Sequence, residues 1–461
     1  MRDAPSPGYR ETSALSLTPA SKRELRGWSG LAVAALALAG VLALLLALSR
    51  TPKIQDFLPW PVQEFFYRAL VTHVVFSFVV WFLGVLGALM VLTTARLAMG
   101  QTRARRLGTV GLGAGALGCL ILLAPALLNW GEPSLNNYVP VVIHPVFYAG
   151  LVLLALGVGM VAVRLILNLP GREVGPVDWG IAAAAAAYLV ALVCFGLALI
   201  AIPSGTGEAL FNERLFWGGG HVLQFVNTAL MLVGWSVLAE ITLGEMPLGP
   251  WLSAAVAGSL VLFVLPAPVF YALFDVLSRE HRDAFTQMLW YGLAPQPVVM
   301  MAGLARLLYQ RRTALPWRDP AFVGLVLSVG LFAVGGLFGF FLGVADTRTP
   351  SHYHAVIGGV NLAAMALYFA LLLPLLGRSS RRAGPIRWQF HLYGFGQLLF
   401  SVGMFLAGEA GVPRKTAGAE QGLDTIGKVV SMAMTGTGGI IAVMGGVMFV
   451  WMALSRLMAR R

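Results

Sequence analysis

The sequence predicts an all-α polytopic membrane protein with twelve transmembrane helices. Its composition differs from that of soluble globular proteins. Of its 461 residues, 58% are hydrophobic and only 11% are charged, whereas soluble globular proteins contain about 25% charged residues. A helix needs about 20 predominantly apolar residues to cross a bilayer. Twelve windows meet that length: residues 28–48, 66–95, 107–128, 142–167, 178–202, 217–241, 250–276, 285–309, 321–343, 351–376, 388–410 and 429–456.

The connections between these windows are short, so we expect one twelve-helix membrane domain over residues 28–456. Residues 1–27 are polar and contain Pro5, Pro7 and a basic cluster. We expect this N-terminal segment to be cytoplasmic and either disordered or interfacial. The first window is long enough to span a membrane and is not followed by a cleavage site and a soluble domain, so a cleaved signal peptide is not predicted.

The net charge of +12 reflects loop charges and does not indicate binding to nucleic acid, because cytoplasmic loops carry an excess of Lys and Arg. A cytoplasmic N-terminus leaves 22 of the 32 Lys and Arg residues on the inner side. We therefore expect an integral protein of a bacterial inner (plasma) membrane with both termini in the cytoplasm. The ten basic residues predicted outside are Arg50, Lys53, Arg68, Arg214, Arg279, Arg282, Arg348, Arg414, Lys415 and Lys428.

The histidines segregate to one side of this topology. His352 and His354 open the window 351–376, and residues two apart on a helix project about 200° apart. They can therefore serve two metals, one on each side, although a pair of interfacial histidines bonded to loops or water fits the same pattern. Six of the seven histidines fall on the predicted outer side, as a buried cofactor layer requires: His73, His144, His221, His281, His352 and His354.

These positions meet the requirements of heme ligation. A bis-histidine heme needs two neutral imidazoles that face each other from two helices at matching depth. His73, in the window 66–95, and His354 meet that requirement. His352 faces the opposite way and would be the proximal ligand of a second heme, with His221 on its distal side.

The order of these features resembles subunit I of the heme–copper oxidase superfamily, which includes cytochrome oxidases and nitric oxide reductases. The shared features are twelve helices, His73 in the second, His221 after the run Phe216-Trp217-Gly218-Gly219-Gly220, and H-x-H opening the tenth. The resemblance covers nearly the whole chain. It implies that His73 and His354 ligate a low-spin heme and that His352 ligates a high-spin heme. It also implies that His221 is the first of three histidines holding a second metal.

Two loop stretches extend the resemblance. Val412-Pro413-Arg414-Lys415 is similar to the family's proline–basic–basic element beside the heme propionates, and Ala345-Asp346-Thr347 is similar to its outer-loop aspartate. Arg414 would offer a planar fork to a carboxylate, and Lys415 a point charge. The plain alternative for Arg414 and Lys415 is an ordinary solvated pair.

The chain differs from the family at the residues that would hold the second metal. The family places two adjacent histidines at the outer end of the seventh helix, where this chain has Phe270 and Tyr271. One imidazole is not a copper site, because copper here needs about three nitrogen ligands, so copper is not expected. The tyrosine that many oxidases place four residues after the helix 6 histidine is Phe225 here. Tyr271 is a candidate redox or hydrogen-bonding group facing the high-spin heme, with interfacial packing as the alternative.

The predicted function is that of a heme-binding membrane oxidoreductase subunit, in which electrons pass from the low-spin to the high-spin heme to reduce oxygen, nitric oxide or a related molecule. The chain has no CxxCH motif and no soluble copper domain, so we expect an electron-donating subunit of the cupredoxin or cytochrome c type on the outer side. His221 would give acid–base help. A non-catalytic electron carrier, a heme gas sensor and a transporter remain as alternatives.

For His144 we expect a capping or interfacial role, and for His281 a solvated loop position.

Overall fold

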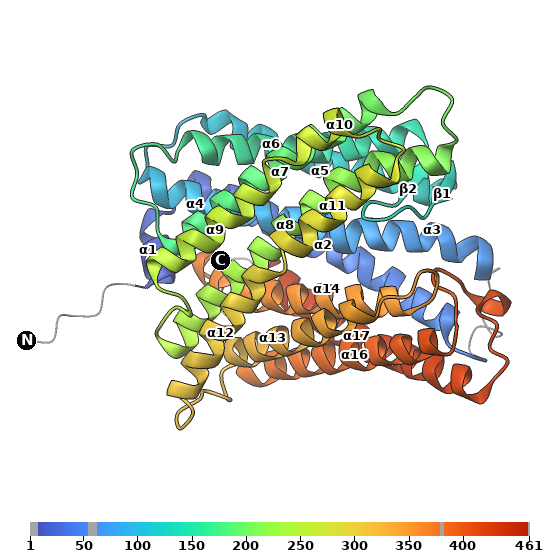
Figure 1. The fold of residues 1–461 in the computed structure, drawn as a ribbon. Helices are drawn as coiled ribbons and strands as arrows, with labels where there is room; N and C mark the ends of the chain where they lie inside the picture. Colours follow the sequence, from blue (N-terminus) through green and yellow to red (C-terminus); the bar gives the residue numbers. More distant parts are fainter. Residues whose placement is uncertain (1–7, 54–61, 379–381, 460–461) are drawn as a thin grey trace, which may run out of the picture.

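Long helices that run side by side between two ends account for nearly all of the structure (Figure 1). This computed structural model describes residues 8–53, 62–378 and 382–459. Its elements are, in order, α1 (Tyr9–Ser16), α2 (Pro19–Arg50), α3 (Val62–Val74), the π-helical η2 (Val75–Val80), α4 (Trp81–Ala98), α5 (Arg105–Leu127), β1 (Glu132–Ser134), β2 (Val141–Ile143), α6 (Pro145–Leu167), α7 (Pro176–Ala201), α8 (Glu208–Leu243), α9 (Pro250–Val264), η3 (Ala267–Val269), α10 (Phe270–Leu273), α11 (Arg279–Gly292), α12 (Pro295–Gln310), α13 (Pro320–Phe338), η4 (Gly339–Phe341), α14 (Arg348–Leu367), η5 (Tyr368–Leu372), α15 (Leu373–Leu375), α16 (Ala383–Glu409), η6 (Gly418–Gln421) and α17 (Ile426–Met458).

Eleven helices in the described part of the chain are long and apolar enough to cross a membrane. This confirms the predicted all-α polytopic membrane fold. The window 285–309 differs from the prediction, because it is divided between α11 and α12, which follow one another along the bundle (Figure 1). Pro295 and Pro297 stand in the first turn of α12. A proline has no N–H to donate to the preceding turn, which interrupts the helical ladder at this point.

Residues 8–27, for which we expected disorder or an interfacial position, are largely helical in α1 and the start of α2. Tyr9 is buried, and its ring lies under the guanidinium of Arg96, 4.1 Å away. The backbone N–H of Tyr9 donates to Glu240 on α8 at 3.2 Å. The segment is therefore anchored on α4 and α8. Residues 1–7 of the predicted N-terminal segment lie outside the described residues.

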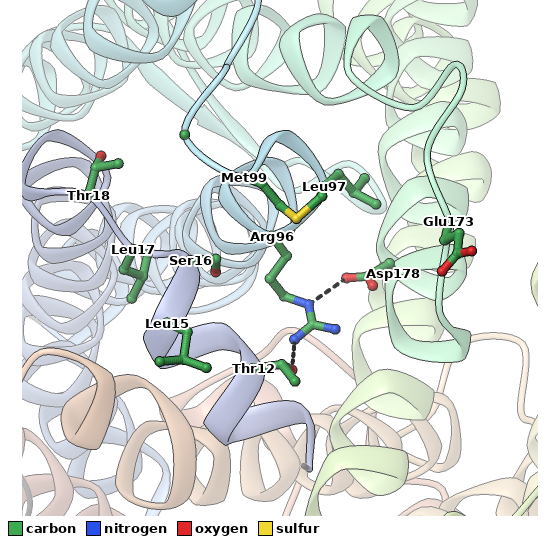
Figure 2. Close-up of a pocket in the computed structure, with 11 residues that line it drawn as sticks. Thr12, Leu15, Ser16, Leu17, Thr18, Arg96, Leu97, Met99, Glu173 and Asp178 are labelled. Atoms are coloured by element: carbon green, nitrogen blue, oxygen red, sulfur yellow. Dashed lines mark hydrogen bonds and ion pairs between the residues drawn. The ribbon is translucent and has the colours of Figure 1, made fainter. Parts of the chain in front are cut away.

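A cavity of about 470 Å³ opens beside α1 (Figure 2). Arg96 crosses it, donating to Asp178 at 3.3 Å and to Thr12 on α1, while Glu173 stands on the far side. The start of α2 and the end of α17 lie together at this end of the bundle, where Arg26 donates to the carbonyl oxygen of Leu457.

The opposite end of the bundle, here called the histidine end, is formed by the start of α3, the β1–β2 hairpin, the starts of α8 and α14 and the loop 410–425. The hairpin pairs Glu132 with Ile143 in antiparallel register. Arg68 on α3 donates to the carbonyl oxygen of Trp130 at 3.1 Å, and Lys415 donates to that of Leu135 within the hairpin loop. These bonds join three segments that are far apart in the sequence.

Small residues allow the helices to approach closely. A Cβ on Gly157 of α6 would lie 2.6 Å from the carbonyl oxygen of Gly111 on α5, and one on Gly403 of α16 would lie 2.6 Å from the amide of Thr435 on α17. Lipid tails are as apolar as leucine, so membrane helices associate through packing and hydrogen bonds rather than through the hydrophobic effect. Close backbone contact at these glycines is consequently a main source of cohesion.

A buried ion pair joins α2 to α6. Arg164 donates to Glu24 at 2.6 Å, and their side chains are 4% and 12% exposed. Removing one partner of a buried pair costs about 3–5 kcal/mol, because the other charge stays uncompensated. We expect Glu24→Ala to lower the free energy of unfolding in detergent by about that amount, measured by thermal or denaturant unfolding.

The matched control is Asp283→Asn, which breaks an exposed pair with Arg279 whose side chains are 52% and 79% exposed. Exposed pairs contribute about 0–1 kcal/mol, so this variant should unfold almost like the parent protein. Equal effects of the two variants would show that the buried pair carries no special weight.

Candidate heme-binding site

The start of α14 carries two histidines that lie against different helices. The Nδ1–H of His352 donates to the carbonyl oxygen of Gly335 on α13 at 2.7 Å. A Cβ on Gly339 would come within 3.0 Å of its ring, so glycine there leaves room for the imidazole. The ring of His354 packs edge-on against Phe400 of α16, with centroids 4.7 Å apart. The two-residue spacing therefore sends the rings to separate neighbours.

His73 stands at the junction of α3 with the π-helical segment η2. Its Nδ1 bonds to the carbonyl oxygen of Ala39 on α2 at 2.9 Å, which leaves Nε2 as the free nitrogen. The His73 imidazole is close enough to His354 for the two rings to interact electrostatically. A histidine that ligates a metal usually donates its other ring N–H to a carbonyl or carboxylate, and π-bulges occur often at functional sites. His73 and His352 both show this bonding pattern.

Arg50 lies next to this histidine pair. Arg50 ends α2, and its guanidinium carbon is 6.0 Å from the ring centre of Phe66. Its Nε and Nη2 are buried and have no hydrogen-bond partner among the described residues. The group also acts electrostatically on His354 and Tyr353. Buried donors of this kind are normally satisfied, so these two nitrogens suit a carboxylate, which none of the described residues supplies. From its place in the sequence, Arg50 is only a loop charge.

The two predicted propionate stretches lie side by side. Asp346 and Pro413 form an isolated antiparallel bridge. Thr347 donates its backbone N–H to Val412 at 3.1 Å, and Arg414 donates its own to Ala345 at 3.0 Å. Residues that are nearly seventy positions apart in the chain thus form one small unit beside the start of α14.

Within that unit the carboxylate of Asp346 is already engaged. Arg348 donates to it from Nε at 3.0 Å and from Nη2 at 2.8 Å, and also donates to Glu409 at 3.0 Å. Hydrogen bonds from Arg348 hold the pKa of Asp346 below its ordinary value. Asp346 therefore anchors Arg348, a residue that the sequence analysis did not single out.

Lys415 is held firmly in the loop. Its backbone is left-handed, with φ of 59°, and its amine donates to the carbonyl oxygen of Leu135. Burial, reinforced by the charge of Arg414, lowers the pKa of Lys415 to about 8. The alternative of an ordinary solvated pair therefore does not describe Lys415.

His221 is 1% exposed and both of its ring nitrogens are engaged. Nδ1 bonds to the carbonyl oxygen of Trp217, one turn earlier, at 2.7 Å. Nε2 bonds to the hydroxyl of Tyr138 in the hairpin loop at 3.0 Å. No pattern in the sequence pointed to Tyr138, because it reaches His221 through a loop between other helices.

A metal would need free nitrogens at this place. Among the described residues no group of three or more His, Cys, Asp or Glu side chains is arranged to hold a metal ion. The single imidazole here is bonded to protein on both sides, so the donor set does not fit a three-nitrogen metal site.

Beside His221 lies a second cluster of buried polar side chains. Tyr271 packs edge-on against His281, with centroids 4.7 Å apart, and both rings contact Phe285. The Tyr271 hydroxyl, both His281 ring nitrogens and two nitrogens of Arg214 are buried without a partner in the described part of the chain. Arg214 also donates to Leu277 at 2.8 Å. Whether Tyr271 serves as a redox or hydrogen-bonding group stays a prediction.

The expectation for His281 was wrong and that for His144 was right. His281 is fully buried, because Ser278 caps α11 and accepts the backbone N–H of His281 at 3.1 Å, which brings the first turn of the helix against α8 and α10. His144 is the N-cap of α6, where its Nδ1 accepts the backbone N–H of Val146 at 3.3 Å.

Sequence comparison gives the family of the chain. A profile described as "Cytochrome C and Quinol oxidase polypeptide I" matches residues 26–455. The chain belongs to this family. An oxidase polypeptide I of this kind, the subunit I of the heme–copper oxidase superfamily, is an integral membrane oxidoreductase subunit whose family implies heme cofactors and partner subunits. The predicted resemblance is thereby confirmed.

Relatives of this oxidase subunit are diverse. It is 31% identical over 353 residues to an uncharacterized protein of Aquifex aeolicus, covering 76% of this chain and 84% of the relative. It is 25% identical over 391 residues to cytochrome c oxidase subunit 1 of Thermus thermophilus, covering 75% and 68%. The fold superposes with a TM-score of 0.74 and 17% identity on a chain of a heme–copper terminal oxidase dimer, covering 96% and 85%.

The lowered pKa of Lys415 can be tested directly. Amine acylation requires the neutral amine, so the acylation rate of Lys415 in the oxidase subunit freed of heme should reach half its maximum near pH 8. The unperturbed pKa of a lysine is about 10.4, and a half-maximum there would contradict the burial argument. The measurement is peptide mass spectrometry after brief labelling across pH 6–11, with Lys415→Arg as the control that removes the labelled peptide.

Proposed function

We propose that this oxidase subunit carries two hemes at the histidine end and passes electrons from a low-spin heme to a high-spin heme that reduces a small molecule such as oxygen or nitric oxide. The observation that supports the proposal best is the shared bonding of His73 and His352. Each bonds Nδ1 to a backbone carbonyl of a neighbouring helix. The tautomer is thereby set, and Nε2 is left for iron.

The low-spin heme would be held by His73 and His354. Both stand at the histidine end, on helices that are distant in sequence, and they lie within electrostatic reach of each other. Beside them, two buried nitrogens of Arg50 have no hydrogen-bond partner among the described residues, which suits a propionate. Arg414 and Lys415 stand on the loop bridged to the start of α14 and suit the same chemistry.

The high-spin heme would be held by His352 on the other face of α14. When bound, heme supplies the iron that carries the electron and binds the gas. The protein's own part is to orient the ligating imidazole through Gly335 and to hold His221 at a fixed position on α8 by two hydrogen bonds. The proposal includes no copper, because the donor set around His221 does not fit it.

The electron donor would be a partner subunit of the cupredoxin or cytochrome c type that docks at the histidine end. In this arrangement the histidine end faces the outside of a bacterial inner membrane and both termini lie in the cytoplasm. The shared position of the start of α2 and the end of α17 at the opposite end and the distribution of Lys and Arg support that orientation.

Replacement of His354 should separate the two hemes. We expect His354→Ala to abolish the low-spin optical signal of the purified protein while part of the high-spin signal remains, because only the low-spin iron loses an axial ligand. The control is His144→Ala, which removes a helix cap at the same end and should leave both signals. Equal loss of both signals in His354→Ala would contradict the assignment of separate ligands.

Carbon monoxide binding separates the enzyme from the second candidate, a non-catalytic electron carrier on the same fold. This candidate is favoured by the engagement of both nitrogens of His221, which leaves no second metal to assist reduction. In the enzyme, the reduced protein binds carbon monoxide at one heme, and His352→Ala loses that binding. A reduced parent protein with two low-spin hemes and no carbon monoxide complex would favour the carrier.

A further inference from the structure

Tyr138 reaches His221 from an unusual backbone position. It lies in the loop between β1 and β2 with φ of 63°, a conformation that non-glycine residues adopt rarely. Its ring centre is 4.6 Å from that of His221 and its hydroxyl is 3.0 Å from Nε2. Left-handed backbone at such a residue persists only where the surroundings enforce it.

Two neighbouring segments hold the loop in this conformation. Asn137 donates to Glu213 on α8 from its backbone N–H at 2.9 Å and from its side chain at 2.7 Å. Lys415 in the loop 410–425 donates to Leu135. These bonds fix the residues just before Tyr138 to α8 and to the loop 410–425.

A missing side chain on α8 makes room for the phenol ring. A Cβ on Gly220 would lie 2.5 Å from both Cβ and Cγ of Tyr138. Those atoms belong to the root of the side chain and cannot swing aside. Gly220, which directly precedes His221, is therefore required for the contact, and its place in the Gly218–Gly220 run gains a specific explanation.

The direction of the hydrogen bond follows from the partners. Trp217 offers a carbonyl oxygen, which can only accept, so Nδ1 of His221 carries the proton. Nε2 of a neutral ring is then an acceptor, and the Tyr138 hydroxyl is the donor. Burial, together with Glu213, raises the pKa of Tyr138 above its ordinary value, so the phenol retains its proton.

We propose that Tyr138 is a positioning residue of the oxidase site, which donates to Nε2 of His221 and closes that nitrogen to metals. This inference deepens the proposed function and rests on it for the second of its two tests. His221 is then neither a metal ligand nor a free base. It is a neutral imidazole with a set tautomer, held by Trp217 on one side and Tyr138 on the other.

The first test needs no heme and is a double-mutant cycle on thermal unfolding of the full chain in detergent. Tyr138→Phe and His221→Phe each remove one partner and keep a ring, so each should lower the unfolding temperature. The double variant should lower it no further than the more damaging single variant, since the shared bond is lost only once. If the two single effects on the unfolding temperature add up in the double variant, Tyr138 and His221 are not coupled and the proposal is wrong.

The control for this test is Tyr148→Phe, which removes another hydrogen-bonded phenol at the same end. Tyr148 donates to Asn212 on α8 at 2.7 Å, away from His221. Its effect should add to that of His221→Phe. If His221→Phe does not fold, His221→Gln replaces it in the cycle, and Gly220→Ala provides an independent way to displace Tyr138.

The second test uses the infrared band of carbon monoxide bound to the reduced protein, since distal hydrogen-bond donors tune heme ligands. We expect Tyr138→Phe and Gly220→Ala to shift the carbon monoxide stretching band similarly, and Tyr148→Phe to leave it unchanged. An unshifted band in both variants would overturn the positioning role.

The two tests fail for different reasons. A protein that shows coupled unfolding but binds no heme would overturn the proposed function and leave the Tyr138–His221 pair intact. A heme protein with additive unfolding and an unshifted band would overturn the pair and leave the proposed function standing.

Discussion

A histidine N–H buried inside a membrane bundle must find its acceptor within the protein, because lipid offers none and an unmet polar group there costs several kcal/mol. Three histidines of this oxidase subunit meet the constraint with backbone carbonyls. His73 uses Ala39, His352 uses Gly335 and His221 uses Trp217. In each ring one nitrogen is thereby committed, and the chemistry left to the site is that of the other nitrogen. Two of these rings keep Nε2 free, and the third gives it to Tyr138.

The loops at the histidine end hold the histidine-bearing helices in place. The hairpin loop is tied to α8 through Glu213 and to the loop 410–425 through Lys415. That loop in turn is bridged to the segment before α14. Helices carry the histidines, and the loops connect those helices across long sequence distances. Rigid support of this kind is what a functional site requires.

The predicted difference from the family lies at Phe270 and Tyr271, near His221. Phe270 and Tyr271, the predicted counterparts of the family's histidine pair, pack against Phe285 and His281. The fold superposes with a TM-score of 0.74 on a chain of a heme–copper terminal oxidase dimer. The predicted low-spin ligands His73 and His354 are features on which the resemblance was based, and the structure adds Arg50 beside them.

The sequence by itself determined the membrane class, the helix windows and the opposed directions of His352 and His354, because hydropathy and helical periodicity are local properties that the bilayer enforces. It also determined that Asp346 and Arg414 are loop residues at one end. Only the tertiary structure decided that these loops pair, that two nitrogens of Arg50 are buried without a partner among the described residues, that His281 turns inward and that Tyr138 bonds to His221. Those facts depend on which distant segments meet. The break between α11 and α12 likewise needed the structure, since an apolar window does not reveal where a helical ladder is interrupted.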